Sequence, residues 1–452
     1  MSFIRSISGI RATQGDDLTP FTVARYCAAF AQFLPTGSIA IARDGRPSGL
    51  WMEYIAAGTF ASLGRETHIL GVVPTPTAQI YVERESVVAG GIVLTASHNP
   101  SEWNGMKFLG GDGVFLDTDE NREFWTYLDK PITFPTILRN DTTHLVNNVV
   151  ERHIEAVTAV LSSAEREQIR NKRYRIAVDA VNAAGSRAIP ELLRALGCTP
   201  IPLYCDGSGI FPHMPEPVPA HLGALGAAVR ENNADFGIAV DPDADRLVLI
   251  DEHGIPTNEE MTITLAAASV FSGELPQGFA PICVVNYSTT RAVDAAVLRY
   301  GGKVERVPVG EINVVQAMRK NCAVVGGEGS GGVILPYCHY GRDSLVGTAL
   351  IIRLLARSGG TLSELSASMP QFAMRKTKFP FEGNASDVFA RLEAEFSSAE
   401  LNRDDGVYFN FGTSWLHARA SNTEPIIRAI AESPSPDETE RLLGIAAKTI
   451  AK

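Results

Sequence analysis

The chain has 452 residues, of which 45% are hydrophobic and 20% are charged, with a formal net charge of −11. A chain of this length divides into roughly three domains that each bury a core of their own. The acidic balance excludes sequence-independent binding to nucleic acid, which requires a basic face. It leaves anionic substrates open, because local arginines override the global field.

The cysteines and the N-terminus indicate the compartment. Six cysteines are scattered without a CxxC pair or metal-finger spacing, at Cys27, Cys198, Cys205, Cys283, Cys322 and Cys338. We interpret them as reduced, mostly buried thiols of a cytosolic protein. The first residues, MSFIRSISGIRATQGDD, lack the apolar core of a signal peptide, and no apolar run approaches the ~18 residues that span a membrane. We therefore expect a soluble, cytoplasmic protein.

Apolar strand-like runs alternate with helical stretches along the chain, which is typical of the α/β class. Three segments predict a strand, a small or polar turn and a helix: SIAIARDGRPSG, YRIAVDAVNAAGS and PICVVNYSTTRAVDAAV. Each precedes a second strand that ends in a residue-rich loop, so the pattern indicates a threefold repeat of topology. We expect domains at 1–150, 151–254 and 255–370, followed by a smaller α+β domain at 371–452.

The first of these loops contains a serine. The apolar strand Gly91 to Leu94 leads into Thr-Ala-Ser-His-Asn-Pro, which places Ser97 among small residues ahead of Pro100. Small neighbours leave room around the hydroxyl, and the proline restricts how the chain leaves the turn. A serine at a strand end serves as a nucleophile or phosphoryl carrier when a base and charge stabilisers converge on it. The alternative is a plain turn former or helix cap.

The second loop is acidic. Asp241, Asp243 and Asp245 lie at alternate positions between the strands FGIAV and LVLIDE. Three such carboxylates suit one hard cation, and Mg²⁺ completed by a phosphate oxygen fits best. An EF-hand calcium loop is excluded because Arg246 stands where its glycine is required and because strands flank the loop. A solvated acidic turn remains the alternative.

The third loop is rich in glycine. The sequence GGEGSGG follows the apolar strand CAVV and offers Glu328 as an acceptor and Ser330 as a donor and acceptor. These groups suit sugar hydroxyls better than phosphate, since a carboxylate repels an anion. The loop lacks the GxxxxGK[ST] pattern, so no P-loop is implied. A flexible turn is the other interpretation.

A fourth loop, in the last domain, reads RASNTEPIIR and places Arg419 and Arg428 around small hydroxyl and amide residues. The guanidiniums of both arginines would fork onto an anion, with further donors from Ser421, Asn422 and Thr423. This predicts a cradle for a phosphomonoester. An N-capped turn with surface arginines is the alternative.

Taken in this order, the loops resemble those of the α-D-phosphohexomutase superfamily, over essentially the whole chain. The motifs that carry the resemblance are TASHNP, DPDADR, GEGSGG and RASNTEP. Supporting matches are SGIR with Arg11, ARDGRPSG, PTPT, and NGMK with Lys107. The form GEGSGGVILP…HYGRD looks most like the phosphoglucosamine mutase branch, close to the phosphomannomutases.

The resemblance implies three related α/β domains and a smaller C-terminal domain around one central cleft. Ser97 would carry the phosphoryl group, and one Mg²⁺ per chain would be held by Asp241, Asp243 and Asp245, with a phosphoserine oxygen as a further ligand. Glu328 and Ser330 would bind ring hydroxyls. The non-reacting phosphate would be held by Arg419, Ser421, Asn422, Thr423 and Arg428.

The implied reaction passes the phosphoryl group from Ser97 to one end of a hexose phosphate. The resulting sugar bisphosphate, also the activator, turns end for end and returns its other phosphoryl group. Arg11 and Arg246 would neutralise charge. We expect Lys107 to handle the proton at the sugar hydroxyl, since a lysine among other cations can have a lowered pKa. His98 would orient the loop or contact phosphate.

Two departures from the family pattern stand out. Many bacterial members have GExSGH, whereas this chain has Gly332 in place of the histidine, so His339 or Arg342 are candidate substitutes. The N-terminal motif reads SGIRA where SGIRG is usual.

We therefore expect a phosphohexomutase that acts on a phosphosugar and converts glucosamine 6-phosphate to glucosamine 1-phosphate. Phosphomannomutase or phosphoglucomutase activity uses the same residues and stays open. A sugar-phosphate phosphatase, which would keep Ser97 and Mg²⁺, is the weaker alternative, because it need not bind its substrate in two orientations and both the Glu328 and Arg419 loops are present. A non-catalytic sensor would tolerate loss of Ser97 or an aspartate, and none is lost. No nucleic-acid or membrane partner is expected, and a monomer and a homodimer are both compatible with the sequence.

Overall fold

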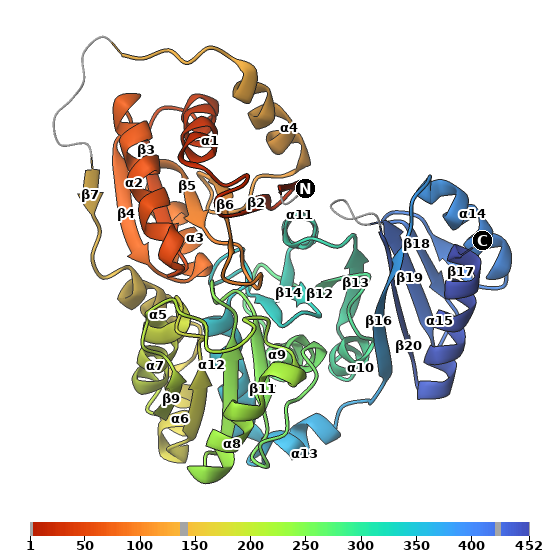
Figure 1. Cartoon of the computed structure of the whole chain (residues 1–452). Coiled ribbons are helices and arrows are strands. Elements are labelled where there is room, and N and C mark those ends of the chain that lie inside the picture. The colour runs from red at the N-terminus through yellow and green to blue at the C-terminus, as the bar shows by residue number, and fades with distance from the viewer. Residues whose placement is uncertain (1–2, 136–142, 421–425, 452) are drawn as a thin grey trace. The chain divides into compact units, whose positions relative to one another are not determined.

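The computed structural model describes residues 3–135, 143–420 and 426–451. The chain divides into two compact units: one from Met1–Thr262 and Ser330–Ser366, the other from Ile263–Gly329 and Ala367–Lys452. Figure 1 follows the chain through both. The helices α9 (Glu260–Phe271) and α13 (Leu362–Ala367) contain the points at which the chain passes between the units.

The first unit begins with a seven-stranded sheet. Its order is β1 (Ile4–Ser6), β2 (Gly9–Thr13), β6 (Trp103–Gly110), β5 (Val88–Leu94), β3 (Ser38–Arg43), β4 (Thr67–Val72) and β7 (Thr143–Leu145). The strand β3 pairs in parallel with β4 and β5, whereas β6 is antiparallel to β2 and β5. The accompanying helices are α1 (Pro20–Phe33), α2 (Pro47–Ser62), α3 (Thr75–Arg84), α4 (Thr118–Thr126) and the short 3₁₀ helix η1 (Tyr127–Asp129).

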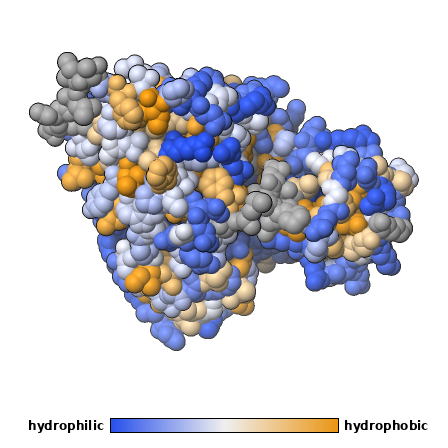
Figure 2. All heavy atoms as spheres, turned by 45° about the horizontal axis from the view of Figure 1, so that its top comes forward, coloured by the Kyte–Doolittle hydropathy of each residue, from blue (hydrophilic) through white to orange (hydrophobic). Residues whose placement is uncertain are grey.

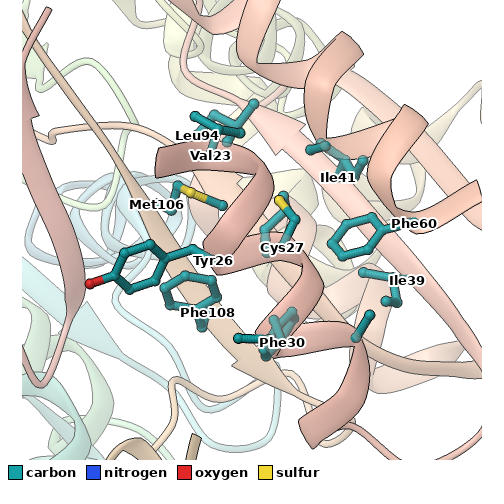
Figure 3. Packing of buried hydrophobic residues seen from close by; sticks show 14 of the residues in the cluster. Val23, Tyr26, Cys27, Phe30, Ile39, Ile41, Phe60, Leu94, Met106 and Phe108 are labelled. Atoms are coloured by element: carbon teal, nitrogen blue, oxygen red, sulfur yellow. The ribbon is translucent and has the colours of Figure 1, made fainter. Parts of the chain in front are cut away.

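The core of this region is aromatic. Helix α1 begins where the Thr19 side chain accepts a hydrogen bond from the backbone N–H of Thr22, and it turns Phe30 toward the sheet. The ring of Phe30 lies 5.0 Å from that of Phe108 on β6 and 5.5 Å from that of Phe124 on α4, centroid to centroid. Figure 3 shows Phe30 and Phe108 in this cluster. The packing fixes β6, the strand that carries Lys107.

A second sheet has the order β11 (Leu247–Ile250), β10 (Phe236–Val240), β8 (Arg175–Asp179) and β9 (Thr199–Tyr204). The strands β10 and β11 are antiparallel, so the segment between them forms a hairpin loop. Its helices are α5 (Val149–Ala159), α6 (Ser163–Lys172), α7 (Gly185–Ala195), the 3₁₀ helix η2 (Pro219–His221) and α8 (Gly223–Glu231). The strand β15 (Gly332–Ile334) and helix α12 (Ser344–Ser358) complete this unit.

The second unit contains the parallel strands β13 (Lys303–Val307), β12 (Ala280–Asn286) and β14 (Ala323–Glu328), with helices α10 (Ala292–Leu298) and α11 (Glu311–Asn321). It also contains a five-stranded antiparallel sheet with the order β16 (Ala373–Pro380), β20 (Ile426–Ser433), β19 (Trp415–Ala420), β18 (Val407–Asn410) and β17 (Glu400–Asn402). Helices α14 (Ala385–Glu395) and α15 (Pro436–Ile450) pack with this sheet. The predicted α/β class with an α+β C-terminal region is confirmed. The domain boundaries and the central cleft stay predictions.

The glycine-rich segment differs from the sequence expectation, because β14 continues through Gly326 and Gly327 to Glu328. A Cβ placed on Gly326 would lie 2.4 Å from the sulfur of Met318 on α11. Glycine at this position therefore allows the helix to approach the strand, and the turn starts only at Gly329.

Among residues 3–135, 143–420 and 426–451, every helix is too short or too polar to cross a lipid bilayer. On the face shown in Figure 2, hydrophobic side chains are scattered among hydrophilic ones. All six cysteines are free thiols, and only Cys322 is exposed.

Candidate active site

The Ser97 loop follows β5 directly and is held in a conformation that non-glycine residues rarely adopt. The backbone of Ser97 has φ +50°, and the residue is 1% exposed. Its N–H donates to Oγ1 of Thr95 at 2.8 Å, and that hydroxyl donates in turn to Oδ2 of Asp44 at 2.6 Å. The serine hydroxyl is thus presented by a braced turn at the end of a buried strand.

The acidic loop occupies the hairpin between β10 and β11. Asp241, Asp243 and Asp245 are each fully buried, and their carboxylate oxygens lie within 4.8 Å of one another. Oδ1 of Asp241 accepts the backbone N–H groups of Asp245 and Arg246, at 3.2 and 3.1 Å, which closes the loop on itself. The three carboxylates predicted to converge do so.

The serine and the acidic loop meet. Oγ of Ser97 donates a hydrogen bond to Oδ2 of Asp241 at 2.9 Å. Helix α3, which begins in the PTPT segment, joins them: Thr75 donates through its hydroxyl to Oδ2 of Asp243 at 2.7 Å and through its N–H to the carbonyl of Asp243 at 2.9 Å. Sequence reasoning noted PTPT only as a supporting motif and missed this contact.

Cations hold one oxygen of two of these carboxylates. Nζ of Lys107 lies 2.6 Å from Oδ2 of Asp243 and 3.0 Å from Oδ2 of Asp245. Arg342, which follows β15, places Nη2 2.7 Å from the same Oδ2 of Asp245. Oδ1 of Asp243 and Oδ1 of Asp245 are buried without a hydrogen-bond partner among the described residues.

These two oxygens, which accept no hydrogen bond from the described residues, are the test of whether a divalent cation fits. The nearest cation to Oδ1 of Asp245 is Nε of Arg246, at an ion-pair distance of 3.9 Å. Leaving a buried carboxylate oxygen unpaired is costly. The site offers only oxygen donors, which are the ligands that Mg²⁺ prefers. They are Oδ1 of Asp243, Oδ1 of Asp245, an oxygen of Asp241 and Oγ of Ser97. The residues therefore fit the cation that the sequence predicted.

The pKa values of Asp241 and Asp245 are shifted in opposite directions. Burial, reinforced by Asp245 and Asp243, raises the pKa of Asp241 well above its usual range. Burial also acts against ionised Asp245, but Arg342 and Lys107 outweigh it and lower the pKa of that carboxyl. The charge of Asp241 is therefore compensated less well than that of Asp245.

The pKa argument for Lys107 was wrong. Burial disfavours the charged ammonium, but Asp243 and Asp245 outweigh burial and raise the pKa of Lys107. The sequence placed this lysine among cations, whereas β6 inserts it between two carboxylates. Lys107 is therefore a proton donor at neutral pH, and its assignment to proton handling stays a prediction.

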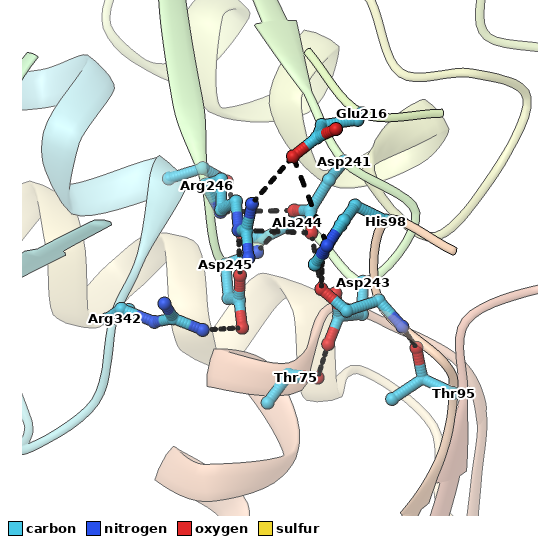
Figure 4. A network of polar contacts seen from close by, with 12 residues as sticks. Thr75, Thr95, His98, Glu216, Asp241, Asp243, Ala244, Asp245, Arg246 and Arg342 are labelled. Carbon is cyan, nitrogen blue, oxygen red and sulfur yellow. Dashed lines mark hydrogen bonds and ion pairs between the residues drawn. The ribbon is translucent and has the colours of Figure 1, made fainter. Parts of the chain in front are cut away.

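Three further predicted residues contact the Ser97 loop or the acidic loop. Nη1 of Arg11 donates to Oδ1 of Asn99 at 3.0 Å, and Nδ1 of His98 lies 3.4 Å from Oγ of Ser97. Burial, then Arg246 and Arg11, lower the pKa of His98 well below its usual value. Figure 4 shows Glu216 facing both Arg246 and His98, with Oε1 of Glu216 3.8 and 4.0 Å from their nitrogens.

His339 and Arg342, the two candidates to replace the histidine missing at Gly332, have different surroundings, and only Arg342 contacts the acidic loop. His339 is 1% exposed and lies in a buried network, with Nε2 3.1 Å from Oδ2 of Asp343. That same oxygen lies 2.8 Å from Nε2 of His153 on α5, whose Nδ1 is 2.8 Å from the hydroxyl of Thr77 on α3. Arg342, in contrast, reaches the acidic loop. A Cβ on Gly332 would lie 2.3 Å from Cδ of Arg342, so this arginine fills the space that a larger residue 332 would need.

The predicted substrate residues of the second unit are partly described. Glu328, at the end of β14, accepts from Nδ2 of Asn286 at 2.8 Å and from the N–H of Gly310 at 3.1 Å. Arg419 on β19 pairs in register with Arg428 on β20. Ser421, Asn422 and Thr423 lie outside the described residues. Ser330, in the first unit, lies half-buried in a turn.

Comparison with known proteins identifies the family. Models of phosphoglucomutase/phosphomannomutase match the chain with α/β/α domain I at residues 4–131, domain II at 151–254 and domain III at 258–372. The chain belongs to the phosphoglucomutase/phosphomannomutase family. The resemblance to the α-D-phosphohexomutase superfamily is thereby confirmed, and the protein is a phosphohexomutase, an intramolecular phosphotransferase of the isomerase class.

Relatives of this phosphohexomutase extend over nearly its whole length. A phosphoglucomutase/phosphomannomutase of Thermococcus kodakarensis is 32% identical, over 98% of this chain and 97% of its own. A probable phosphoglucosamine mutase of Methanopyrus kandleri is also 32% identical, over 96% and 95%. The crystal structure of a phosphoglucomutase/phosphomannomutase family protein from Burkholderia thailandensis has the same fold, with a TM-score of 0.85 at 24% identity over 99% of this chain and 97% of that one.

Proposed function

We propose that this phosphohexomutase interconverts glucosamine 6-phosphate and glucosamine 1-phosphate through a phosphorylated Ser97 and a bound hexose bisphosphate. The observation that carries the proposal is the hydrogen bond from Oγ of Ser97 to Asp241, beside two carboxylate oxygens that lack a hydrogen-bond partner. A hydroxyl at an oxygen-only cation site is arranged for phosphoryl transfer.

In the first half of the reaction, the bond between phosphorus and Oγ of Ser97 breaks and a bond between phosphorus and the sugar oxygen forms. Oγ takes up a proton as it leaves, and the sugar hydroxyl gives one up. We assign both transfers to protonated Lys107, whose pKa is raised by Asp243 and Asp245. It gives its proton to the leaving oxygen and takes up the proton of the sugar hydroxyl, so the lysine ends the step protonated. The second half returns the other phosphoryl group to Ser97 by the reverse steps.

One Mg²⁺ would be held by Asp241, Asp243, Asp245 and a phosphoserine oxygen. When bound, this cation would neutralise charge on the transferred phosphoryl group. Arg11 contacts Asn99 of the Ser97 loop and Arg246 contacts Asp241, and both would bind the remaining oxygens of the phosphoryl group on Ser97. His98 would orient the loop. We assign the ring hydroxyls to Glu328 and Ser330. The distal phosphate would be held by Arg419, Ser421, Asn422, Thr423 and Arg428.

Glucosamine phosphate is proposed because several relatives of about 30% identity are named probable phosphoglucosamine mutase. A second candidate substrate pair, mannose or glucose phosphate, is favoured by the name of the Thermococcus relative. A phosphatase is disfavoured because it has no need to bind its substrate in two orientations.

A coupled assay would compare the 6-phosphates of glucosamine, mannose, glucose and N-acetylglucosamine, with a trace of hexose bisphosphate as primer. We expect the highest kcat/KM for glucosamine 6-phosphate, and a tenfold preference for another sugar would overturn the substrate assignment.

Ser97→Ala should abolish turnover and labelling by ³²P-hexose bisphosphate, whereas Ser101→Ala, on the exposed side of the same loop, should retain both. Full turnover by Ser97→Ala would overturn the carrier assignment.

A further inference from the structure

A buried arginine outside the predicted catalytic set binds the Ser97 loop. Arg46 lies at the start of α2, and its side chain is fully buried. Its Nε donates to Oδ2 of Asp44 at 2.9 Å, and its own N–H donates to Oδ1 of Asp44 at 3.0 Å. A buried charge of this kind persists only when it is paired and its remaining donors are satisfied.

The other two nitrogens of the guanidinium donate hydrogen bonds to backbone carbonyls of the Ser97 loop. Nη2 of Arg46 donates to the carbonyls of Ser97, at 2.5 Å, and Asn99, at 2.7 Å. Nη1 donates to the carbonyls of Pro100, at 2.7 Å, and Trp103, at 3.0 Å. Four carbonyls between positions 97 and 103 thus converge on one planar group.

Asp44 holds the other side of the same turn. Its Oδ2 accepts both Nε of Arg46 and the Thr95 hydroxyl, which in turn accepts the N–H of Ser97. Ser97 is therefore held at its N–H through Asp44 and at its carbonyl through Arg46. This grip accounts for a serine with φ +50°, a conformation that costs free energy and persists only where its surroundings impose it.

A loop from the neighbouring sheet covers the arginine. The ring of Phe211 lies over the Arg46 guanidinium, with 4.8 Å from Cζ to the ring centroid. Gly209 touches Gly45 so closely that a Cβ on Gly209 would lie 1.9 Å from the Gly45 carbonyl oxygen. The same stretch of chain continues to Glu216, which faces His98 and Arg246.

We propose that Arg46 is a positioning residue for phosphoryl transfer: with Asp44 and under Phe211, it imposes the backbone conformation that presents Oγ of Ser97. The inference rests on the proposed function of Ser97. It predicts that the geometry of the Arg46 fork, and not its charge alone, sets the transfer rate, because a lysine in its place binds as a point charge.

The test compares Arg46→Lys with Arg353→Lys, a matched change of another buried arginine, on α12. We expect kcat of Arg46→Lys to fall about 100-fold, as for a displaced nucleophile, with KM for the sugar phosphate unchanged. Hydrogen–deuterium exchange of the peptide containing Ser97, Asn99 and Trp103 should accelerate, while exchange in the sheet strands stays at the wild-type rate. Arg353→Lys should leave the kcat and the exchange of that peptide unchanged.

Phe211→Leu serves as a second variant that keeps the arginine and removes its cover, in case Arg46→Lys does not fold. We expect a smaller fall in kcat with the same local exchange signature. Unchanged kcat and exchange in the folded variants would overturn the inference, as would a rise in KM with kcat unchanged. Exchange needs no substrate, so a wild-type enzyme that never labels at Ser97 would overturn the proposed function separately.

Discussion

Lys107 and Arg342 converge on the same oxygen, Oδ2 of Asp245, from strand and loop segments more than 200 positions apart, at 3.0 and 2.7 Å. Their convergence leaves Oδ1 of Asp245 without a hydrogen-bond partner among the described residues. The protein thus compensates the aspartates unequally. Asp245 is well paired, whereas Asp241 is disfavoured in its charged form.

This inequality predicts opposite stability effects of two similar variants. In chelator, Asp241→Asn should raise the free energy of unfolding by about 0.5–2 kcal/mol, because it removes a poorly compensated buried charge. Asp245→Asn should lower it by about 3–5 kcal/mol, because it removes the buried carboxylate charge that Lys107 and Arg342 share. Urea unfolding measures both. Equal signs for the two variants would contradict the unequal compensation.

The same two variants test the cation site. Saturating Mg²⁺ at ~100 times its dissociation constant should stabilise the wild type by about 2.7 kcal/mol. Neither variant should show this gain, and neither should bind Mn²⁺ tightly when titrated under electron paramagnetic resonance. Undiminished Mn²⁺ binding by both would rule out the acidic loop as the cation site.

Gly332 and Arg342 should be energetically coupled. Gly332→Ala places a Cβ against the arginine stem and should displace it from Asp245, lowering kcat/KM about tenfold. In an Arg342→Ala background the same change should be nearly neutral, which gives a coupling of at least about 1 kcal/mol in a double-mutant cycle. Gly444→Ala is the control, because nothing lies near the added methyl group. Additive effects of the two changes would show that their side chains do not compete for space.

The buried network around Asp343 should make stability pH-dependent. Burial disfavours the charged carboxylate, but His153 and hydrogen bonds from both imidazoles outweigh burial and lower the pKa of Asp343. A depressed pKa contributes stability that is present above the unfolded value near pH 4 and is lost as the pH falls through the folded value. Asp343→Asn should therefore cost about 3–5 kcal/mol at neutral pH, and this deficit should shrink in acid. The exposed control Asp387→Asn should show no such pattern, and a deficit that grows in acid would contradict the assignment.

The loop over Arg46 should respond to pH in the opposite direction. Burial lowers the pKa of His213, but its hydrogen bond to Asp179 outweighs burial and raises it. The stabilisation is then fully present below the unfolded value of about 6.5 and is lost as the pH rises through the folded one. His213→Gln should lose about 1.5 kcal/mol near pH 6, and this loss should shrink as the pH rises from 6 into the alkaline range. A constant loss across that range would show that the charge of His213 contributes nothing.

The sequence predicted that Ser97 and the three aspartates share a site, and the structure brings them together. Each follows an apolar strand whose end can be read locally. Sequence reasoning missed Thr75 and Arg46, and it left Arg342 as one of two alternatives, because their roles depend on contacts made far along the chain. Thr75 lies 168 positions from its partner Asp243. The prediction of a lowered pKa for Lys107 failed for the same reason, because its neighbours, Asp243 and Asp245, are acids that lie far along the chain. The glycines of β14 were predicted to form a loop, whereas the structure has them in a strand against which a helix packs closely. Close packing and a flexible turn both favour glycine, so composition alone does not distinguish them.

The acidic loop is assembled from segments that leave the ribosome at different times. By the time β10 and its loop emerge, Lys107, Thr75 and the Ser97 turn already exist, but Arg342 does not. Asp245 must wait roughly 100 residues, about 5 to 20 s at typical synthesis rates, for Arg342, one of its three cationic neighbours. During that interval the acidic hairpin of the nascent chain lacks one of its cations. A divalent cation bound there would stabilise the hairpin before Arg342 is available.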